Sequence, residues 1–105
     1  MEMLVLELLS ESPGYGYQLL TRLAAAPSGL LQVKEGTLYP ILYRLEADGM
    51  LAAGWQTGEG RSTPKKMYTI TPKGLTELQC QKEIWMKFQQ DLAWIQQKGG
   101  DNHEN

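Results

Sequence analysis

The sequence predicts a mainly α-helical chain with one small β-hairpin and a long helix toward its C-terminal end. Three observations predict this fold. Apolar residues recur at helical spacing in three short segments before residue 50, strand-like segments separated by turn formers follow over 51–70, and a second helical pattern then continues to about residue 98. The length of 105 residues suits one small domain with one appended element.

Two short helices are expected in the first quarter of the chain. Residues 3–11 carry apolar side chains at helical spacing, and Pro13 and Gly14 end this pattern. A second helix is expected from about Tyr15 to Ala26, because a Pro-Ser-Gly run follows it. These two segments are typical of the first helices of a small helical domain.

The segment KEGTLYPILYRLEADG, residues 34–49, predicts a third helix. Its buried stripe is expected to consist of Leu38, Ile41, Leu42 and Leu45. Because proline breaks a helix interior, Pro40 is expected in or near the first turn, with the helix beginning around Gly36 and Gly49 following its end. The opposite face holds small residues, tyrosines and an arginine instead of Glu/Lys pairs, which favours a partner surface over a solvated face.

The hairpin is predicted by two strand-like segments, LAAGWQT (51–57) and KMYTI (66–70). The tip between them, residues 58–65, is rich in turn formers and ends in basic residues. Thr71 and Pro72 then form a helix N-cap and first position, and the helix is expected to reach about Lys98.

Heptad spacing in this last helix predicts a second copy of the chain as partner. Leu78, Trp85 and Leu92 recur every seven residues, and Gln81, Phe88 and Ile95 lie three positions after them. A helix of about 40 Å is too long for so small a core to cover. We therefore expect a homodimer whose interface holds Leu78, Trp85, Phe88, Leu92 and Ile95, the alternative being a helix packed on its own domain.

This order of elements is typical of a winged helix-turn-helix domain, expected over 1–71, with a C-terminal dimerisation helix over 72–98 and a disordered tail over 99–105. The third helix would read base edges in the major groove of duplex DNA. Arg61, Lys65 and Lys66 of the hairpin would anchor phosphates.

Composition excludes several other functions. The single cysteine, Cys80, forms no CxxC pair, so no metal site is expected, and a lone His103 leaves no nucleophile–base pair for an enzyme; no cofactor is expected. No apolar run is long enough for a membrane span and no signal peptide is visible, so a cytoplasmic protein is expected. The net charge is −2, yet residues 34–74 hold six basic and four acidic side chains.

Three segments resemble the signature of the PadR family of transcriptional regulators: PGYGYQL (13–19), EGTLYPILYRLEADGML (35–51) and KKMYTITPKG (65–74). The single C-terminal helix is similar to that of the short members. The resemblance implies a winged-helix repressor that is dimeric through its last helix, binds a pseudo-palindromic operator in double-stranded DNA, and is released by a small molecule or a stress signal.

The resemblance also implies roles for individual residues. Tyr17 would lie near DNA phosphate, and Lys65 and Lys66 match the basic pair before the second wing strand. Trp85 resembles a tryptophan that lines a dimer-interface pocket for flat aromatic compounds in some members, and the alternative is a tryptophan that only fills the interface. The recognition helix is matched by Thr37, Tyr39, Pro40, Tyr43 and Arg44.

The leading hypothesis is a dimeric DNA-binding regulator. Thr37, Tyr43 and Arg44 would lie at or near bases, whereas phosphates would be held by Tyr17, Tyr39, Arg61, Lys65 and Lys66. Two alternatives stay open: a protein-interaction module that uses the tyrosine face, and a sensor of small aromatic ligands that uses the aromatic dimer interface.

Overall fold

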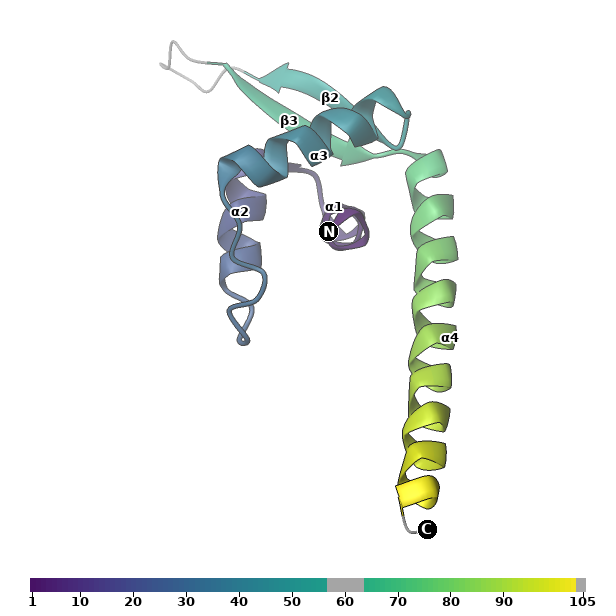
Figure 1. Ribbon diagram of the computed structural model, residues 1–105. Coiled ribbons are helices and arrows are strands. Elements are labelled where there is room, and N and C mark those ends of the chain that lie inside the picture. The colour runs from purple at the N-terminus through teal and green to yellow at the C-terminus, as the bar shows by residue number, and fades with distance from the viewer. Residues whose placement is uncertain (57–63, 104–105) are drawn as a thin grey trace.

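The structure, a computed structural model, describes residues 1–56 and 64–103, with side chains described as far as Lys98. It confirms the predicted fold class of helices with a small sheet and a long last helix (Figure 1). The elements are α1 (Glu2–Glu11), β1 (Gly14–Tyr15), α2 (Gly16–Ala24), α3 (Glu35–Ala47), β2 (Leu51–Gln56), β3 (Lys65–Ile70) and α4 (Pro72–His103).

The sheet has three antiparallel strands in the order β1-β3-β2. The hairpin strands pair from Leu51 opposite Ile70 to Gln56 opposite Lys65. The third strand, β1, pairs Gly14 with Tyr68 and was not expected from the sequence, because two residues after a proline carry no alternating pattern. It ties the start of α2 directly to the hairpin.

One apolar core joins the three short helices, the sheet and the first turns of α4. The stripe predicted on α3 is confirmed, since all four of its residues are buried. The remaining buried hydrophobic side chains come from the other elements: Val5, Leu6, Leu9, Leu19, Leu23, Leu51, Tyr68 and Leu78. Removing this apolar surface from water supplies the main favourable free energy of folding.

Pro40 lies near the start of α3, as expected. The helix begins at Glu35, one residue before the expected start, so Pro40 falls at the beginning of the second turn. A proline leaves the carbonyl four residues earlier without its helical donor, and here that carbonyl belongs to Gly36. Gly36 is exposed and near the helix start, where water can satisfy the free carbonyl oxygen.

The start of α4 is bonded to the turn that follows α3. The Thr71 hydroxyl donates to the Gly49 carbonyl (2.7 Å) and accepts from the Gly74 amide (3.0 Å), which confirms Thr71 as the N-cap. The Thr71 amide donates to the Met50 carbonyl at 3.0 Å. Gly49 takes a positive φ of 80°, a conformation that favours glycine after a helix end.

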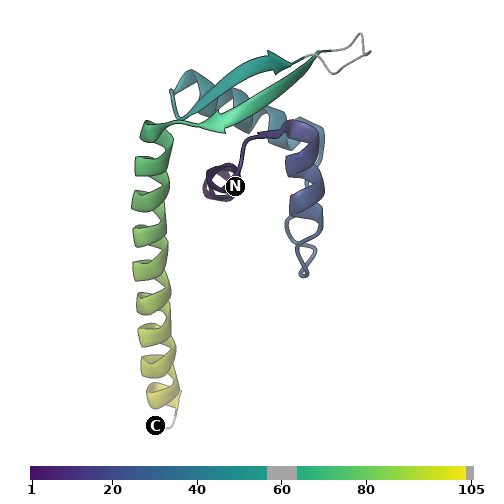
Figure 2. The same cartoon turned by 180° about the vertical axis from the view of Figure 1, so that it is seen from behind.

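The long helix α4 leaves the domain and projects away from it (Figures 1 and 2). Leu78, which we expected at the dimer interface, is instead buried in the core of its own domain with 5% of its surface exposed. From residue 82 to residue 98 every side chain of α4 is exposed. Only the first turns of α4 therefore belong to the folded core.

The helix also continues beyond its expected end. It runs through Gly99 and Gly100 to His103, so the expected disordered tail is helical as far as His103, and residues 104–105 lie outside the described residues. A glycine inside a helix costs about 1 kcal/mol but does not by itself end the helix. Within residues 1–56 and 64–103, none of the helices is both long and apolar enough to span a bilayer.

Gly74→Ala is expected to destabilise the protein, because a Cβ at residue 74 would lie 2.2 Å from the Met50 carbonyl oxygen. Overpacking of this kind costs about 1–3 kcal/mol. The matched control is Gly36→Ala, where a Cβ meets nothing within 4 Å and helix propensity predicts a gain of up to about 1 kcal/mol. Urea unfolding of both variants measures the difference, and equal stabilities would contradict the close backbone approach at residue 74.

Candidate nucleic-acid interface

An aromatic groove of about 510 Å³ lies between the start of α2, the outer face of α3 and the hairpin. The groove is also lined by two lysines at the beginning of β3, Lys65 and Lys66. Its aromatic lining residues are Tyr15, Tyr17, Tyr39, Tyr43, Trp55 and Tyr68. The groove thus combines flat aromatic surfaces with two cationic groups, a combination suited to a polyanion with flat bases.

Tyr39 reaches into the groove because α2 begins with a glycine. A Cβ at Gly16 would lie 2.6 Å from the Tyr39 hydroxyl oxygen and 2.7 Å from ring carbons, so the ring rests against bare backbone. The Tyr39 and Tyr43 ring centroids are 6.1 Å apart, one helical turn along α3. Burial raises the pKa of Tyr39 above its ordinary value, so its hydroxyl stays protonated and able to donate at neutral pH.

The two lysines have different surroundings. The Lys65 ammonium lies 5.6 Å from the Tyr15 ring centroid and the side chain is exposed. The Lys66 ammonium forms an ion pair with the Glu46 carboxylate at 2.8 Å, and the hydrogen bond from this pair raises the pKa of Lys66. Lys66 is therefore cationic at neutral pH, and its charge is balanced by a carboxylate within the domain.

Five of the predicted DNA-binding residues line this groove: Tyr17, Tyr39, Tyr43, Lys65 and Lys66. Thr37 and Pro40 are exposed on α3 but are not among the lining residues. The Arg44 guanidinium is bonded instead to the Glu2 carboxylate at the start of α1, with an Nε–Oε2 distance of 2.8 Å. Arg61, predicted to anchor a phosphate, lies outside the described residues.

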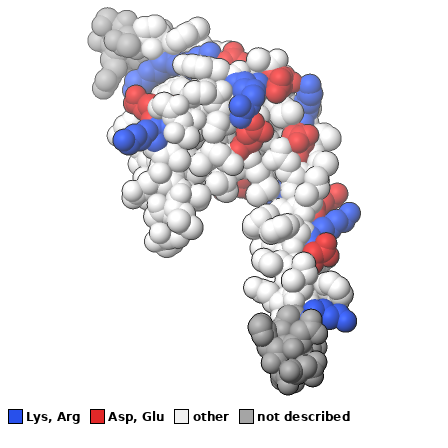
Figure 3. Space-filling view, in the orientation of Figure 1, with Lys and Arg blue, Asp and Glu red and all other residues white. Residues whose placement is uncertain are grey.

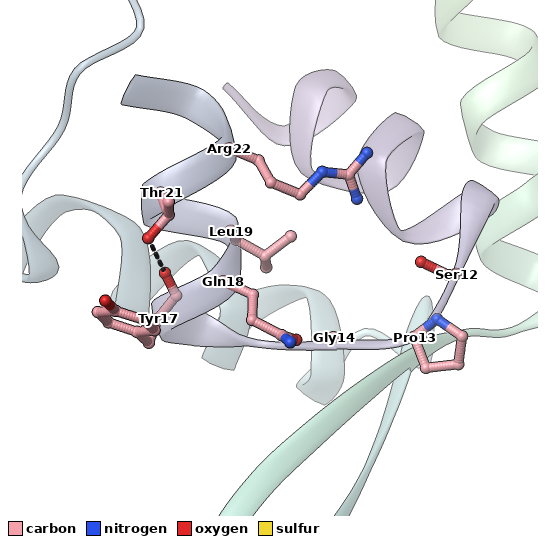
Figure 4. Close-up of a pocket in the computed structure, with 8 residues that line it drawn as sticks. All are labelled: Ser12, Pro13, Gly14, Tyr17, Gln18, Leu19, Thr21 and Arg22. Carbon is pink, nitrogen blue, oxygen red and sulfur yellow. Dashed lines mark hydrogen bonds between the residues drawn. The ribbon is translucent and has the colours of Figure 1, made fainter. Parts of the chain in front are cut away.

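Tyr17 and Arg22 project to opposite sides of α2 (Figure 4). The Tyr17 side chain is 72% exposed and also borders a second hollow of about 310 Å³ on α2. Arg22 turns toward α1, where it pairs with Glu11 at 2.6 Å. The cation beside this hollow is thus engaged within the domain, which leaves the aromatic groove as the stronger candidate interface.

Three aromatic lining residues of the groove were missed in the sequence: Tyr15, Trp55 and Tyr68. The strand alternation that predicted the hairpin puts Tyr68 and Ile70 on one face of β3 and could have placed Tyr68 there. Trp55 lies directly opposite Lys66 in the hairpin, a relation that only the strand register reveals. Tyr15 enters through β1 and its hydroxyl donates to Gln56 of β2 at 3.2 Å.

A separate apolar surface covers the outer part of α4. Trp85 and Phe88 stack with ring centroids 5.5 Å apart and planes inclined by 17°, and both are about half exposed. They line an open recess of about 360 Å³ together with Met3 of α1 and Ile84. In Figure 3 the charged side chains of α4 lie along its outer edge, whereas the side facing the rest of the molecule is uncharged.

Three short helices followed by a hairpin, with an exposed aromatic and basic groove on the third helix, define a winged helix-turn-helix protein. Residues 5–80 match the Transcriptional regulator PadR-like family. The chain belongs to this family, which is one of transcriptional regulators and not of enzymes.

Individual relatives agree with this assignment. The transcriptional regulator Rv3488 of Mycobacterium tuberculosis is 45% identical over 72 residues, which is 69% of this chain and 61% of that protein's length. A PadR family regulator from Eggerthella lenta has 35% identity and a TM-score of 0.77, covering 90% of this chain and 79% of that one. Bacillus subtilis PadR, solved in complex with operator DNA, has 28% identity and a TM-score of 0.67, covering 74% and 44% respectively.

Gly16→Ala is expected to displace the Tyr39 ring from the groove, since a Cβ at residue 16 would lie within 2.7 Å of that ring. The ring can rotate away, so the folded state should persist with a loss of about 1–3 kcal/mol in unfolding free energy. NMR contacts between Tyr39 and Tyr43 should weaken. In a Tyr39→Leu background the same change should cost clearly less, and an equal cost in both backgrounds would contradict this packing.

Proposed function

We propose that this protein is a dimeric, sequence-specific DNA-binding regulator that acts as a repressor in the cytoplasm. In this proposal α3 enters the major groove, with Thr37, Tyr43 and Arg44 at or near base edges. Tyr17, Tyr39, Lys65 and Arg61 hold the flanking phosphates, whereas Lys66, which the sequence also assigned to phosphate, is paired with Glu46 within the domain. Arg44 would have to exchange its Glu2 partner for DNA.

The observation that carries the proposal is the convergence of three separate segments on one groove. Tyr17 comes from α2, Tyr39 and Tyr43 from α3, and Lys65 from the hairpin, and all line the same surface. A core-packing role does not explain this, because Tyr17 and Tyr43 are 72% and 54% exposed. The operator complex of the Bacillus subtilis relative further supports DNA as the partner.

The exposed part of α4 supports a dimer. Phe88, Leu92 and Ile95 are 55%, 44% and 56% exposed on a helix that its own domain does not cover. A second α4 packed along this heptad stripe would remove these side chains from water. The two copies of α3 would then face successive major grooves, about 34–36 Å apart on a pseudo-palindromic operator.

The recess at Trp85 supports a second role for the same surface. A flat aromatic effector could stack on Trp85 and Phe88, whose rings are already parallel to within 17°. In this proposal the effector or another stress signal relieves repression by changing how the two α4 helices pack. The competing role of Trp85 is to fill the dimer interface without any ligand.

The function is tested by fluorescence anisotropy with duplex DNA from upstream of the protein's own gene and with random duplex of equal length, at 50 and 200 mM salt. We expect preference for the upstream DNA. Lys65→Ala should reduce the slope of log affinity against log salt by about 0.9, the value for one phosphate contact. The control is Lys87→Ala, the same loss of charge on the exposed part of α4. Absence of preference would favour a protein-interaction module that uses the tyrosine face.

Trp85→Ala is expected to shift the protein from dimer to monomer at micromolar concentration, because truncating a buried interface tryptophan often costs 2 kcal/mol or more. Sedimentation velocity measures the change. Trp94→Ala is the matched control, since Trp94 is 59% exposed, against 48% for Trp85, but lies off the heptad stripe, with the Lys98 ammonium 5.5 Å from its ring centroid. A monomeric wild-type protein, or equal effects of both variants, would contradict the proposed interface.

A further inference from the structure

The Lys66 side chain is enclosed by groups of its own domain. Its ammonium lies 5.4 Å from the Tyr43 ring centroid, 5.5 Å from that of Tyr68 and 5.9 Å from that of Trp55. The Glu46 carboxylate closes the remaining side at 2.8 Å, and about a quarter of the Lys66 side chain is exposed. Three ring faces and one carboxylate thus form a cage that is already occupied by a cation.

This cage joins the recognition helix to the hairpin. Glu46 and Tyr43 lie one turn apart on α3, whereas Lys66 and Trp55 face each other across β3 and β2. A lysine held by these groups fixes the distance between α3 and the hairpin. Extending it toward a DNA phosphate would break the ion pair and remove the ammonium from the rings.

Lys65, the next residue, provides the contrast. It is exposed, its ammonium approaches one ring, and within the described part of the chain no carboxylate is paired with it. The two neighbouring lysines of β3 thus differ. The charge of Lys66 is balanced by Glu46, whereas the charge of Lys65 is not paired with a carboxylate of the described residues. The difference comes from Glu46, a residue that no aromatic or basic pattern in the sequence indicates.

We propose that Glu46 is a specificity-determining residue of the DNA interface, because it keeps Lys66 inside the aromatic cage and out of sequence-independent phosphate contact. This inference rests on the proposed DNA-binding function. With Glu46 present, Lys66 positions Tyr43 against the hairpin and adds little to the general attraction for DNA. Without Glu46, the released ammonium becomes one more phosphate anchor on any duplex.

The test is Glu46→Gln, which keeps the size and polarity of the side chain but removes its charge. On random duplex we expect the slope of log affinity against log salt to steepen by about 0.9. The loss of affinity between 50 and 200 mM salt then becomes about 3.5-fold larger than in the wild type, as one added phosphate contact requires. The ratio of affinities for upstream and random DNA should fall correspondingly, and thermal melting followed by circular dichroism verifies that the variant is folded.

Two comparisons separate release of Lys66 from mere loss of a negative charge. Glu7→Gln makes the same change of charge in the Glu7–Lys82 pair, a 2.9 Å contact between α1 and α4 away from the groove, and should leave the slope unchanged. In a Lys66→Met background, Glu46→Gln should also leave the slope unchanged. A slope increase of the same size in that background would overturn the inference, as would a Glu46→Gln slope equal to that of wild type.

Failure of the inference is distinguishable from failure of the proposed function. If the wild-type protein prefers its upstream DNA and Glu46→Gln behaves like Glu7→Gln, only the role of Glu46 is overturned. If the wild-type protein shows no preference and no salt-dependent affinity for either duplex, the DNA-binding function fails, and the role of Glu46 fails with it.

Discussion

The rest of the structure depends on the backbone contact between the start of α4 and the turn after α3. Gly74 leaves no room for even one carbon atom against the Met50 carbonyl, and Lys73 donates to the Asp48 carbonyl at 2.8 Å. Because the end of α3 is bonded to the first turn of α4, the direction of α4 is set relative to α3. In the proposed dimer, a rearrangement where two α4 helices pack would be passed to α3 through this short, well-bonded turn. The turn would then connect the proposed effector surface on α4 to the proposed DNA-contacting helix α3.

A second constraint holds the groove open. The Tyr39 ring can approach the start of α2 this closely only because residue 16 has no side chain, and β1 fixes that start through the pairing of Gly14 with Tyr68. The aromatic walls are thus positioned by main-chain contacts between α2, α3 and β3. A surface built in this way keeps its shape before a partner arrives, so binding costs less conformational entropy than binding to a loop.

Elements with a strong local pattern could be predicted from the sequence, and those that depend on tertiary contact could not. The α3 stripe and the Thr71 cap follow from helical spacing and cap chemistry, and both are confirmed. The two-residue β1 has no periodicity of its own. Leu78 fits the heptad of α4 as well as it fits the core, and only the packing of α4 against α1 and β3 decides between them. In the candidate site, residue type indicated Tyr43 and Lys66. The ion pairs of Lys66 with Glu46 and of Arg44 with Glu2 depend on strand register and helix packing, so the sequence did not indicate them.

If the chain acts as the proposed dimer, these ion pairs give a physical reason why a chain with a net charge of −2 would need a second copy to bind DNA well. Arg22, Arg44 and Lys66 each face a carboxylate of the same domain, so the general attraction of one domain for a phosphate backbone is small. A weak half-site becomes effective when a second one is held nearby, because joining raises the effective concentration of the second binding event. The uncovered apolar stripe of α4 is the element that can supply this joining. In the proposed dimer, two weakly binding domains joined through α4 would favour a paired operator over random DNA, where only one domain at a time finds suitable contacts.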